Sequence, residues 1–288
     1  MKRVALFLVC LIGLSLPGLA QPKRKPAPGD LVTTPLVPAD ISRLPDGMEQ
    51  VEIYLLIGQS NMKGRGVMPE KPFQDPQIVM MHLRTDEWFH ARHPLHLTGD
   101  PKTFKGADNA GVGPGLSFAQ SLSRKKPTTR IALVPCARGG TAISKWQKGQ
   151  RLYDETVRKA KLTLKQAPTG KARIAGAIWL QGEADSQTPE KIAAYPERLG
   201  KMIDDLRTDL GIPDLPFVAC TIGELRDPKE PRAAINKILL NISELRPNTA
   251  CVDSRSFAAD IGDRVHFDTE TQEKHGKIFA ELMLKLQK

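Results

Sequence analysis

An α/β fold of three layers is predicted, with helices on both faces of a central, mostly parallel sheet of five strands. From residue 51 onward, apolar strand-like runs alternate with amphipathic helical runs. The strand-like runs are almost continuously apolar, which is typical of parallel strands that are buried on both faces. The 288 residues suffice for one domain of this kind, and they contain no internal repeat.

Each strand is predicted where apolar residues follow one another with little interruption, at residues 51–57, 130–135, 174–180, 217–222 and 249–252. Helices are predicted between the strands, at residues 115–126, 151–166, 189–210 and 231–245. The third of these helices is expected to be interrupted near a proline at 196. The last helix is expected to begin at Thr269, because Thr269 and Gln272 have the spacing of a capping box. Ligands of such sheets bind beyond the carboxyl ends of the strands, so functional residues are expected there.

The N-terminus has the features of an export signal over residues 1–20. Lys2 and Arg3 precede an apolar run, and small residues ahead of Gln21 suit cleavage. The run is shorter than the roughly 20 apolar residues of a membrane span, although an uncleaved anchor remains the alternative. We therefore expect a secreted or periplasmic protein with no stable membrane association after cleavage. Residues 21–49 are rich in proline and are expected to form a linker or a wrap over the domain surface.

Charge and cysteine content exclude several classes of protein. The net charge is +10, but the basic residues are scattered, so no nucleic-acid partner is expected. Three cysteines follow the signal, at Cys136, Cys220 and Cys251, without the CxxC spacing of a zinc or redox site. Each lies in an apolar segment, so we expect buried side chains that pack as small hydrophobes. Composition leaves the oligomeric state open.

A serine follows the first predicted strand, and a histidine follows the last predicted strand. Ser60 directly follows the first strand, and Gly58 permits the tight turn that would expose its hydroxyl. His266 lies just before the last helix, three residues after Asp263. A carboxylate at this spacing can hydrogen-bond to the imidazole and fix its tautomer and orientation. Both pieces are expected at the same edge of the sheet.

Two further polar clusters follow the second and third strands. Gly139 and Gly140 follow the second, where glycine lets backbone N–H groups approach a ligand closely. Gln181 and Glu183 follow the third, and the Gln181 amide could donate to a developing oxyanion. Each cluster alone has an ordinary structural explanation as a tight turn or a polar strand end. Four clusters at four strand ends together indicate a catalytic site.

The long segment at residues 63–109 is predicted to be a surface loop that shapes the site. It contains three histidines at intervals of three residues, His90, His93 and His96, for which a metal site is conceivable. Pro94 argues against the regular helix that would align them, so no metal site is expected. Two tryptophans, Trp88 and Trp146, could stack on sugar rings or pack within the protein.

The combined motifs resemble the SGNH/GDSL hydrolase superfamily, whose fold is a flavodoxin-like sandwich. Within it, the chain is similar to the carbohydrate acetylesterase branch, which includes acetylxylan esterases and sialate O-acetylesterase domains. The resemblance covers residues 50–286, within a predicted domain at 50–288, and rests on the segments GQSNM at 58–62, VGPG at 112–115, PCARGGTAISKW at 135–146, WLQGEADS at 179–186 and GDRVHFD at 262–268.

The resemblance implies a catalytic role for each of these clusters. Ser60 corresponds to the nucleophile, His266 to the base and Asp263 to the acid that orients it. The oxyanion donors correspond to the backbone N–H of Ser60 and of the glycine pair, chiefly Gly140, together with Gln181. Residues expected to support them are Gln59, Asn61, Gly139 and Glu183. Many relatives carry asparagine where this chain has Gln181, and whether Asp263 or Glu183 orients the histidine stays open.

The function implied is hydrolysis of O-acetyl esters on carbohydrate through an acyl-enzyme on Ser60, with no metal or organic cofactor. The expected partner is therefore an acetylated carbohydrate, and the sugar itself is not specified. Two alternatives remain at this point. One is an esterase for larger acyl groups such as feruloyl, and the other is a carbohydrate-binding module that has kept the fold without catalysis.

Overall fold

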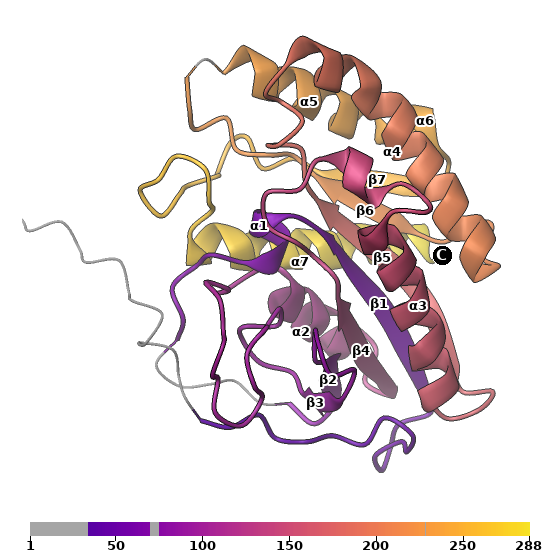
Figure 1. Ribbon diagram of the computed structural model, residues 1–288. Coiled ribbons are helices and arrows are strands. Elements are labelled where there is room, and N and C mark those ends of the chain that lie inside the picture. The colour runs from indigo at the N-terminus through magenta and orange to yellow at the C-terminus, as the bar shows by residue number, and fades with distance from the viewer. Residues whose placement is uncertain (1–33, 70–74, 228) are drawn as a thin grey trace, which may run out of the picture.

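The computed structural model describes residues 34–69, 75–227 and 229–288. The proposed signal and the first part of the proline-rich segment lie outside the described residues. Within them, seven strands form one sheet in the order β3-β2-β4-β1-β5-β6-β7, with helices on both faces (Figure 1). The three-layer α/β architecture predicted from the sequence is therefore confirmed.

Five adjacent strands of the sheet, β4-β1-β5-β6-β7, correspond to the five predicted strands, and all of them are parallel. Their bounds are β1 Gln50–Gly58, β4 Thr129–Pro135, β5 Ala172–Leu180, β6 Phe217–Cys220 and β7 Thr249–Val252. Alternate residues of β1 pack into two hydrophobic cores, one on each face of the sheet. Ile53 and Leu55 pack on one face of the sheet, while Tyr54 and Leu56 pack on the other. Burying such a side chain contributes about 1.5–3 kcal/mol, so both faces stabilise the strand.

Two further strands correct the five-strand prediction. They come from the segment that was predicted to be a surface loop, and they are β2 Ile78–Met81 and β3 Trp88–His90. β2 pairs parallel to β4, and β3 pairs antiparallel to β2 at the edge of the sheet. All four residues of β2 are buried. A strand of this length, buried on both faces, has no alternation that would distinguish it from a short apolar stretch in a loop.

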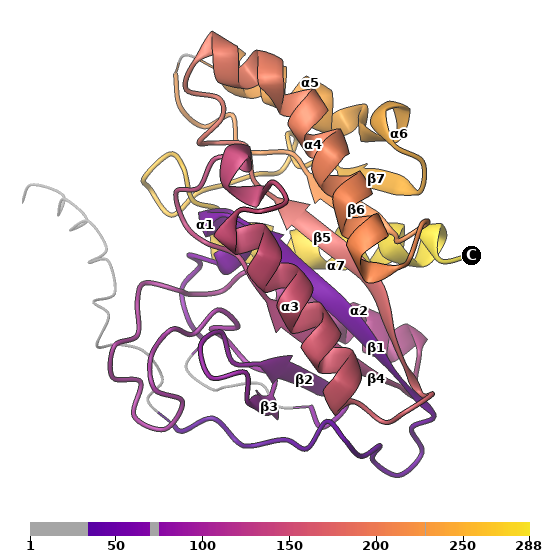
Figure 2. The same cartoon turned by 45° about the vertical axis from the view of Figure 1, so that its right-hand side comes forward.

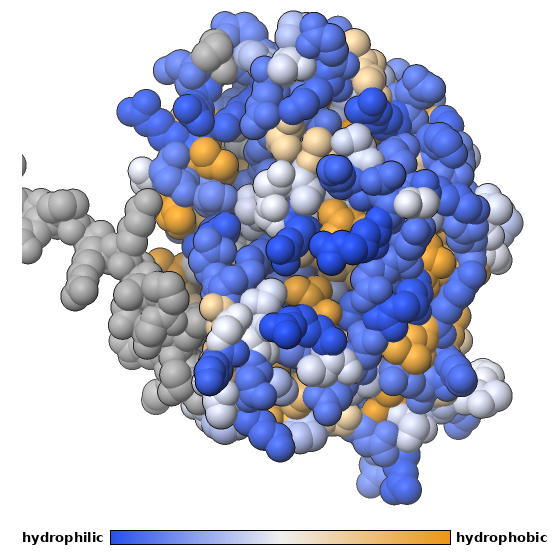
Figure 3. All heavy atoms as spheres, in the orientation of Figure 1, coloured by the Kyte–Doolittle hydropathy of each residue, from blue (hydrophilic) through white to orange (hydrophobic). Residues whose placement is uncertain are grey.

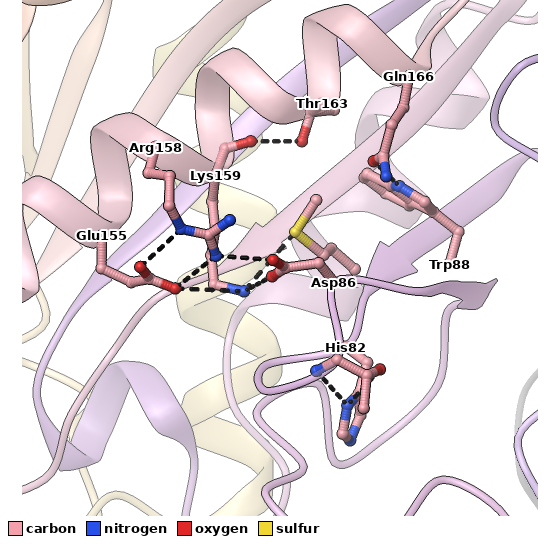
Figure 4. A network of polar contacts seen from close by, with 10 residues as sticks. His82, Asp86, Trp88, Glu155, Arg158, Lys159, Thr163 and Gln166 are labelled. Carbon is pink, nitrogen blue, oxygen red and sulfur yellow. Dashed lines mark hydrogen bonds and ion pairs between the residues drawn. The ribbon is translucent and has the colours of Figure 1, made fainter.

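The described part of the proline-rich segment lies beside β3. The backbone N–H of His90 donates to Val37 O at 2.9 Å, and that of Ala39 donates to Trp88 O at 2.9 Å. Next to it, a polar network joins the turn between β2 and β3 to the adjacent helix (Figure 4). Asp86 in this turn forms ion pairs with Arg158 and with the buried Lys159. The described part of the proline-rich segment thus covers the β3 edge of the sheet, and the ion pairs of Asp86 attach the turn between β2 and β3 to the helix.

The helices form two layers that flank the sheet (Figures 1 and 2). One layer contains α3 Arg151–Gln166, α4 Pro189–Leu210 and α5 Glu230–Leu240. The other contains α2 Gly115–Lys125 and α7 Thr269–Leu286, which pack against each other. At their contact, a Cβ on Gly276 would lie 2.0 Å from Ser117 Oγ, so only glycine allows this approach. The short α1 Ser60–Lys63, η2 Ile143–Trp146 and α6 Ile242–Leu245 complete the set in the described residues.

Three details of the helices differ from the prediction. α4 runs unbroken through Pro196, although an interruption was expected there. The predicted helix at 231–245 is divided at Asn241 into α5 and α6. The N-cap of α7 is Asp268, whose side chain accepts the Thr271 N–H at 2.9 Å. The helix begins at Thr269 as expected, but the residue that caps it is Asp268 rather than the threonine of the capping box, since aspartate caps a helix as well as threonine does.

Two of the three cysteines, Cys136 and Cys220, are buried, Cys251 is partly buried, and all three are free thiols. Among the described helices, none combines the length and apolar content that crossing a membrane requires.

Candidate active site

The four polar clusters lie together at the carboxyl ends of the central strands. Backbone hydrogen bonds fix these ends, because the Gln59 N–H donates to Leu180 O at 2.9 Å and the Arg138 N–H donates to Gly58 O at 3.0 Å. Gly58 has a φ of +136°, and a Cβ there would lie 2.3 Å from Leu180 O. Only glycine therefore lets β1 turn sharply between its two neighbouring strands into the segment that carries Ser60.

Ser60, His266 and Asp263 form a continuous chain of hydrogen bonds. Ser60 is the first residue of α1, and its Oγ lies 3.0 Å from Nε2 of His266. The other ring nitrogen, Nδ1, lies 2.6 Å from Oδ2 of Asp263. The hydroxyl is almost buried, while the imidazole is 20% exposed. The imidazole is therefore partly accessible at the edge of the sheet, and the hydroxyl beside it is shielded.

Asp263 is fixed by its own turn. Its Oδ1 accepts the backbone N–H of Val265 at 2.9 Å and that of His266 at 2.8 Å. Burial opposes ionisation, but these donors and the imidazole hold the pKa of the carboxyl below its ordinary value. The ionised Asp263 can keep a proton on Nδ1, which leaves Nε2 free to accept a proton from the serine.

Glu183 contacts a different part of the site. The side-chain amide of Asn61 donates to Glu183 Oε1, and in the described residues no hydrogen bond joins Glu183 to the imidazole. Its second oxygen, Oε2, is buried without a partner, and burial raises the pKa of this carboxyl. On geometry, the acid next to His266 is therefore Asp263.

Asn61 connects the serine turn to the histidine loop. Its amide nitrogen also donates to Val265 O at 3.0 Å, and its Oδ1 accepts the Phe267 N–H at 3.0 Å. These two residues flank His266 in the sequence, so Asn61 holds the histidine loop on both sides. Sequence reasoning placed Asn61 only among supporting residues, because its partners are more than 200 residues away.

Gly139 lies beside the serine. A Cβ on Gly139 would be 3.7 Å from Ser60 Cβ, whereas one on Gly140, with a φ of +71°, would meet nothing within 4 Å. The backbone N–H groups of Ser60, Gly139 and Gly140 donate to no acceptor among the described residues. These groups are therefore available to a ligand, and Gly139 is the glycine that faces Ser60.

Gln181 is engaged inside the protein. Its side chain is fully buried, and Nε2 lies within hydrogen-bonding distance of three acceptors, Asp185 Oδ2, Thr141 O at 3.0 Å and Gln59 Oε1 at 3.3 Å. An amide has two N–H groups, so these acceptors already exceed its capacity. Asp185 also accepts the Ile143 N–H at 2.8 Å. In this arrangement Gln181 and Asp185 hold the glycine loop in place, whereas the sequence suggested that Gln181 donates to the ligand.

The histidines and tryptophans singled out earlier lie apart from this chain. His90 is half-buried on β3, His93 precedes a cis proline, and burial lowers the pKa of His96 to about 3. In the described residues no group of three or more histidine, cysteine or acidic side chains is arranged for a metal ion.

The two tryptophans pack inside the protein. Trp146 is buried against Trp179, with ring centroids 5.4 Å apart. Trp88 is 7% exposed and donates from Nε1 to Gln166 (Figure 4). Neither ring is exposed enough to stack on a sugar, so packing is the role that the geometry supports.

Comparison with known proteins places the chain in a family. The sequence profile of one family, described as carbohydrate esterase, sialic acid-specific acetylesterase, matches residues 50–285. A probable carbohydrate esterase of Arabidopsis thaliana is 31% identical over 255 residues, covering 81% of this chain and 90% of that protein. The crystal structure of the same plant protein superposes with a TM-score of 0.70 and 28% identity, over 82% of this chain and 98% of the other. NanS has the same fold, with a TM-score of 0.67 at 19% identity, over 83% of this chain and 98% of the other.

Proposed function

The chain belongs to the carbohydrate esterase family of sialic acid-specific acetylesterases, and from this premise we propose that it is a secreted serine esterase with Ser60 as nucleophile. Membership of the family makes it a carboxylic ester hydrolase that acts on acetylated carbohydrate. The acyl-enzyme on Ser60 is our proposal. The observation that carries it is the hydrogen-bonded chain from Ser60 Oγ through His266 to Asp263.

In the proposed acylation step, Nε2 of His266 takes the Ser60 proton while Oγ attacks the carbonyl carbon of the acetyl ester. The free backbone N–H groups of Ser60 and Gly139 stabilise the negative oxygen of the tetrahedral intermediate. When the intermediate collapses, the bond to the sugar oxygen breaks, and His266 gives its proton to that oxygen. The products of this half-reaction are the free sugar hydroxyl and an acetyl group on Ser60.

Deacylation repeats the same steps with water. His266 takes a proton from water as the water oxygen attacks the acetyl carbonyl, and it then returns a proton to Ser60 as acetate leaves. The ionised Asp263 stabilises the imidazolium that forms in both half-reactions. His266 makes each of these proton transfers, while the backbone donors stabilise the oxyanion without giving up a proton.

Replacement of Ser60 by alanine tests the proposal. Ser60→Ala should keep the fold and lower kcat by at least about 10³-fold, because the nucleophile is lost while the oxyanion donors remain. The measurement is acetate release from acetylated oligosaccharides and from 4-nitrophenyl acetate, with circular dichroism as the check on folding. A folded variant with near-normal turnover would falsify the mechanism. An inactive wild type would instead favour the non-catalytic binding module.

Export is the remaining part of the proposal. It is supported by the charged start, the apolar run and the small residues ahead of Gln21. The N-terminal residue of the exported protein, determined by mass spectrometry, should be Gln21 or a close neighbour. The full-length N-terminus on a membrane fraction would instead indicate an anchor.

A further inference from the structure

Arg65 lies in the turn that follows α1, five residues after the serine. Its backbone is held by a short ladder, in which the Gly66 N–H donates to Val112 O at 3.0 Å and the Val112 N–H donates to Gly66 O at 2.9 Å. The Gly111 N–H donates to Gly64 O at 3.0 Å on the other side of Arg65. The arginine is therefore presented from a rigid segment.

The Arg65 side chain has no hydrogen-bond acceptor among the described residues. Its Nε is buried without a partner, while the terminal nitrogens are accessible. The two carboxyl groups that attract it, Asp108 and Asp263, are bonded elsewhere, to Lys63 and His266. By contrast, the fully buried arginines all donate to backbone carbonyls, namely Arg92, Arg130, Arg207 and Arg232. A half-buried guanidinium without an acceptor costs desolvation energy that an anionic ligand would offset.

The guanidinium lies near the reacting serine. Nη2 of Arg65 lies 3.9 Å from the position that a Cβ on Gly139 would occupy, and the same position is 3.7 Å from Ser60 Cβ. A sugar whose ester carbonyl contacts Ser60 must therefore pass close to Arg65. Two exposed arginines, Arg138 and Arg264, lie on the glycine and histidine loops. Figure 3 shows strongly hydrophilic side chains gathered near the middle of this face.

We propose that Arg65 binds the carboxylate of an acidic sugar and thereby selects acetylated sugar acids over neutral acetylated sugars. This inference rests on the proposed function, since it places the substrate at Ser60. A guanidinium matches a carboxylate with two parallel N–H···O bonds, which fixes the orientation of the sugar as well as its charge. The acid is a sialic acid or a uronic acid, because both present a carboxylate on the sugar ring.

The test compares substrates that differ only in this charge. The first pair is an O-acetylated sialic acid and its C1 carboxamide, and the second is an acetylated uronic-acid oligosaccharide and an acetylated xylo-oligosaccharide. Arg65→Gln should lower kcat/KM for the acidic member of the recognised pair by about 10–150-fold, the effect of one charged hydrogen-bonded contact. The loss should fall mainly on KM. The neutral member and 4-nitrophenyl acetate should be almost unaffected. Arg65→Lys should restore part of the preference, because it keeps the charge without the planar fork.

Arg138→Gln is the matched control, because it removes the same charge from an exposed position beside Gly139. It should change the preference for the acid far less than Arg65→Gln does. If both variants reduced the preference for the acidic substrate equally, the preference would arise from the general positive charge around the site, and the inference would be overturned. Equal losses of Arg65→Gln on acidic and neutral substrates would also overturn it, as would no loss at all. A wild type that hydrolyses none of these substrates would instead contradict the proposed function.

Discussion

One carboxylate oxygen of Asp263 is hydrogen-bonded to Nδ1 of His266. The other oxygen accepts two backbone N–H groups of the same turn. Glu183, from the end of β5, reaches the same loop only through the amide of Asn61. Asp263 therefore contacts the imidazole directly, whereas Glu183 contacts it only through another residue. Asp263 controls its tautomer and charge directly, whereas Glu183 positions the loop that carries it.

Asparagine at 263 should be far more damaging than glutamine at 183. Asp263→Asn keeps the shape but favours the wrong tautomer, and the corresponding change in a serine protease lowers kcat about 10⁴-fold. Glu183→Gln retains an oxygen that can accept the Asn61 N–H, so kcat should fall by about 10-fold or less. The test is the steady-state kcat of each variant, measured after each has been shown to be folded. A greater loss for Glu183→Gln would transfer the orienting role to that residue.

Predictability at this scale depended on how far apart the partners are in the sequence. Asp263 and His266 were recognisable because they are three residues apart in one turn. The connection of Asn61 to Glu183 spans 122 residues, and that of Asp185 to Ile143 spans 42. No local spacing reports such contacts, so the sequence identified the polar strand ends without the bonds between them. Arg65 went unnoticed for the same reason, since its isolation is visible only in three dimensions.

At the scale of elements, continuous burial made β1 and β5 predictable, whereas β2 and β3, the last two strands at one side of the sheet, were not predicted. β1 and β5 read as long apolar runs because helices cover both faces of the sheet. β2 has four residues and β3 has three, and charged residues lie close to both. Their strand character depends on the pairing of β2 with β4, on that of β3 with β2, and on the chain that covers β3. Tertiary contacts of this kind leave no periodic signal in the sequence.

The turn between β2 and β3 depends on the charge of Asp86. Asp86→Ala would leave the buried Lys159 with only Glu155, whose nearest oxygen is 3.9 Å away. Removal of one partner from a buried ion pair costs about 3–5 kcal/mol, and the lower end applies here because Asp86 is 22% exposed. We expect the free energy of unfolding in urea to fall by about 3 kcal/mol.

The volume-matched Lys159→Met is the control for this prediction. It removes the buried charge and leaves Asp86 paired with Arg158, so its cost should be clearly smaller. If Lys159→Met destabilised the protein as much as Asp86→Ala, packing around the lysine stem would matter more than the ion pair.

At the scale of the whole molecule, the two ends of the sheet carry different polar networks. The carboxyl edge holds the Ser60 chain, while the amino end of β1 holds the buried Glu52. This carboxylate accepts from Lys126 Nζ at 2.6 Å, from Tyr54 Oη at 2.6 Å and from Arg173. Gln287 joins the same network from the end of α7. The proposed catalytic carboxyl group, Asp263, and the buried carboxyl group of Glu52 thus belong to separate networks.

Acid should weaken the fold through Glu52. Burial raises its pKa, but the hydrogen bonds and charges around it outweigh burial and hold the pKa below its ordinary value of 4.5. The ionised form therefore stabilises the folded state above about pH 4.5, and this stabilisation is lost as the pH falls through the folded pKa. Glu52→Gln should lower the free energy of unfolding at pH 7 by about 2 kcal/mol and flatten its dependence on pH below 4.5.

Urea unfolding of both proteins from pH 7 to pH 3 measures this difference, and kcat at pH 7 provides the control. The variant should keep the wild-type kcat, because Glu52 lies at the opposite end of β1 from Ser60. Parallel stability curves for the two proteins would exclude Glu52 from the acid response.

The contact between Ser60 and His266 joins residues that are 206 positions apart, and six of the seven described strands of the sheet lie between them in the sequence. Ribosomes make the serine early and the histidine late. During most of its synthesis the growing chain therefore carries a nucleophile without a base, and it is chemically inert toward acetylated sugars. Under the proposed mechanism, hydrolysis requires the histidine loop to be docked on Asn61, so the appearance of turnover reports the formation of this long-range contact.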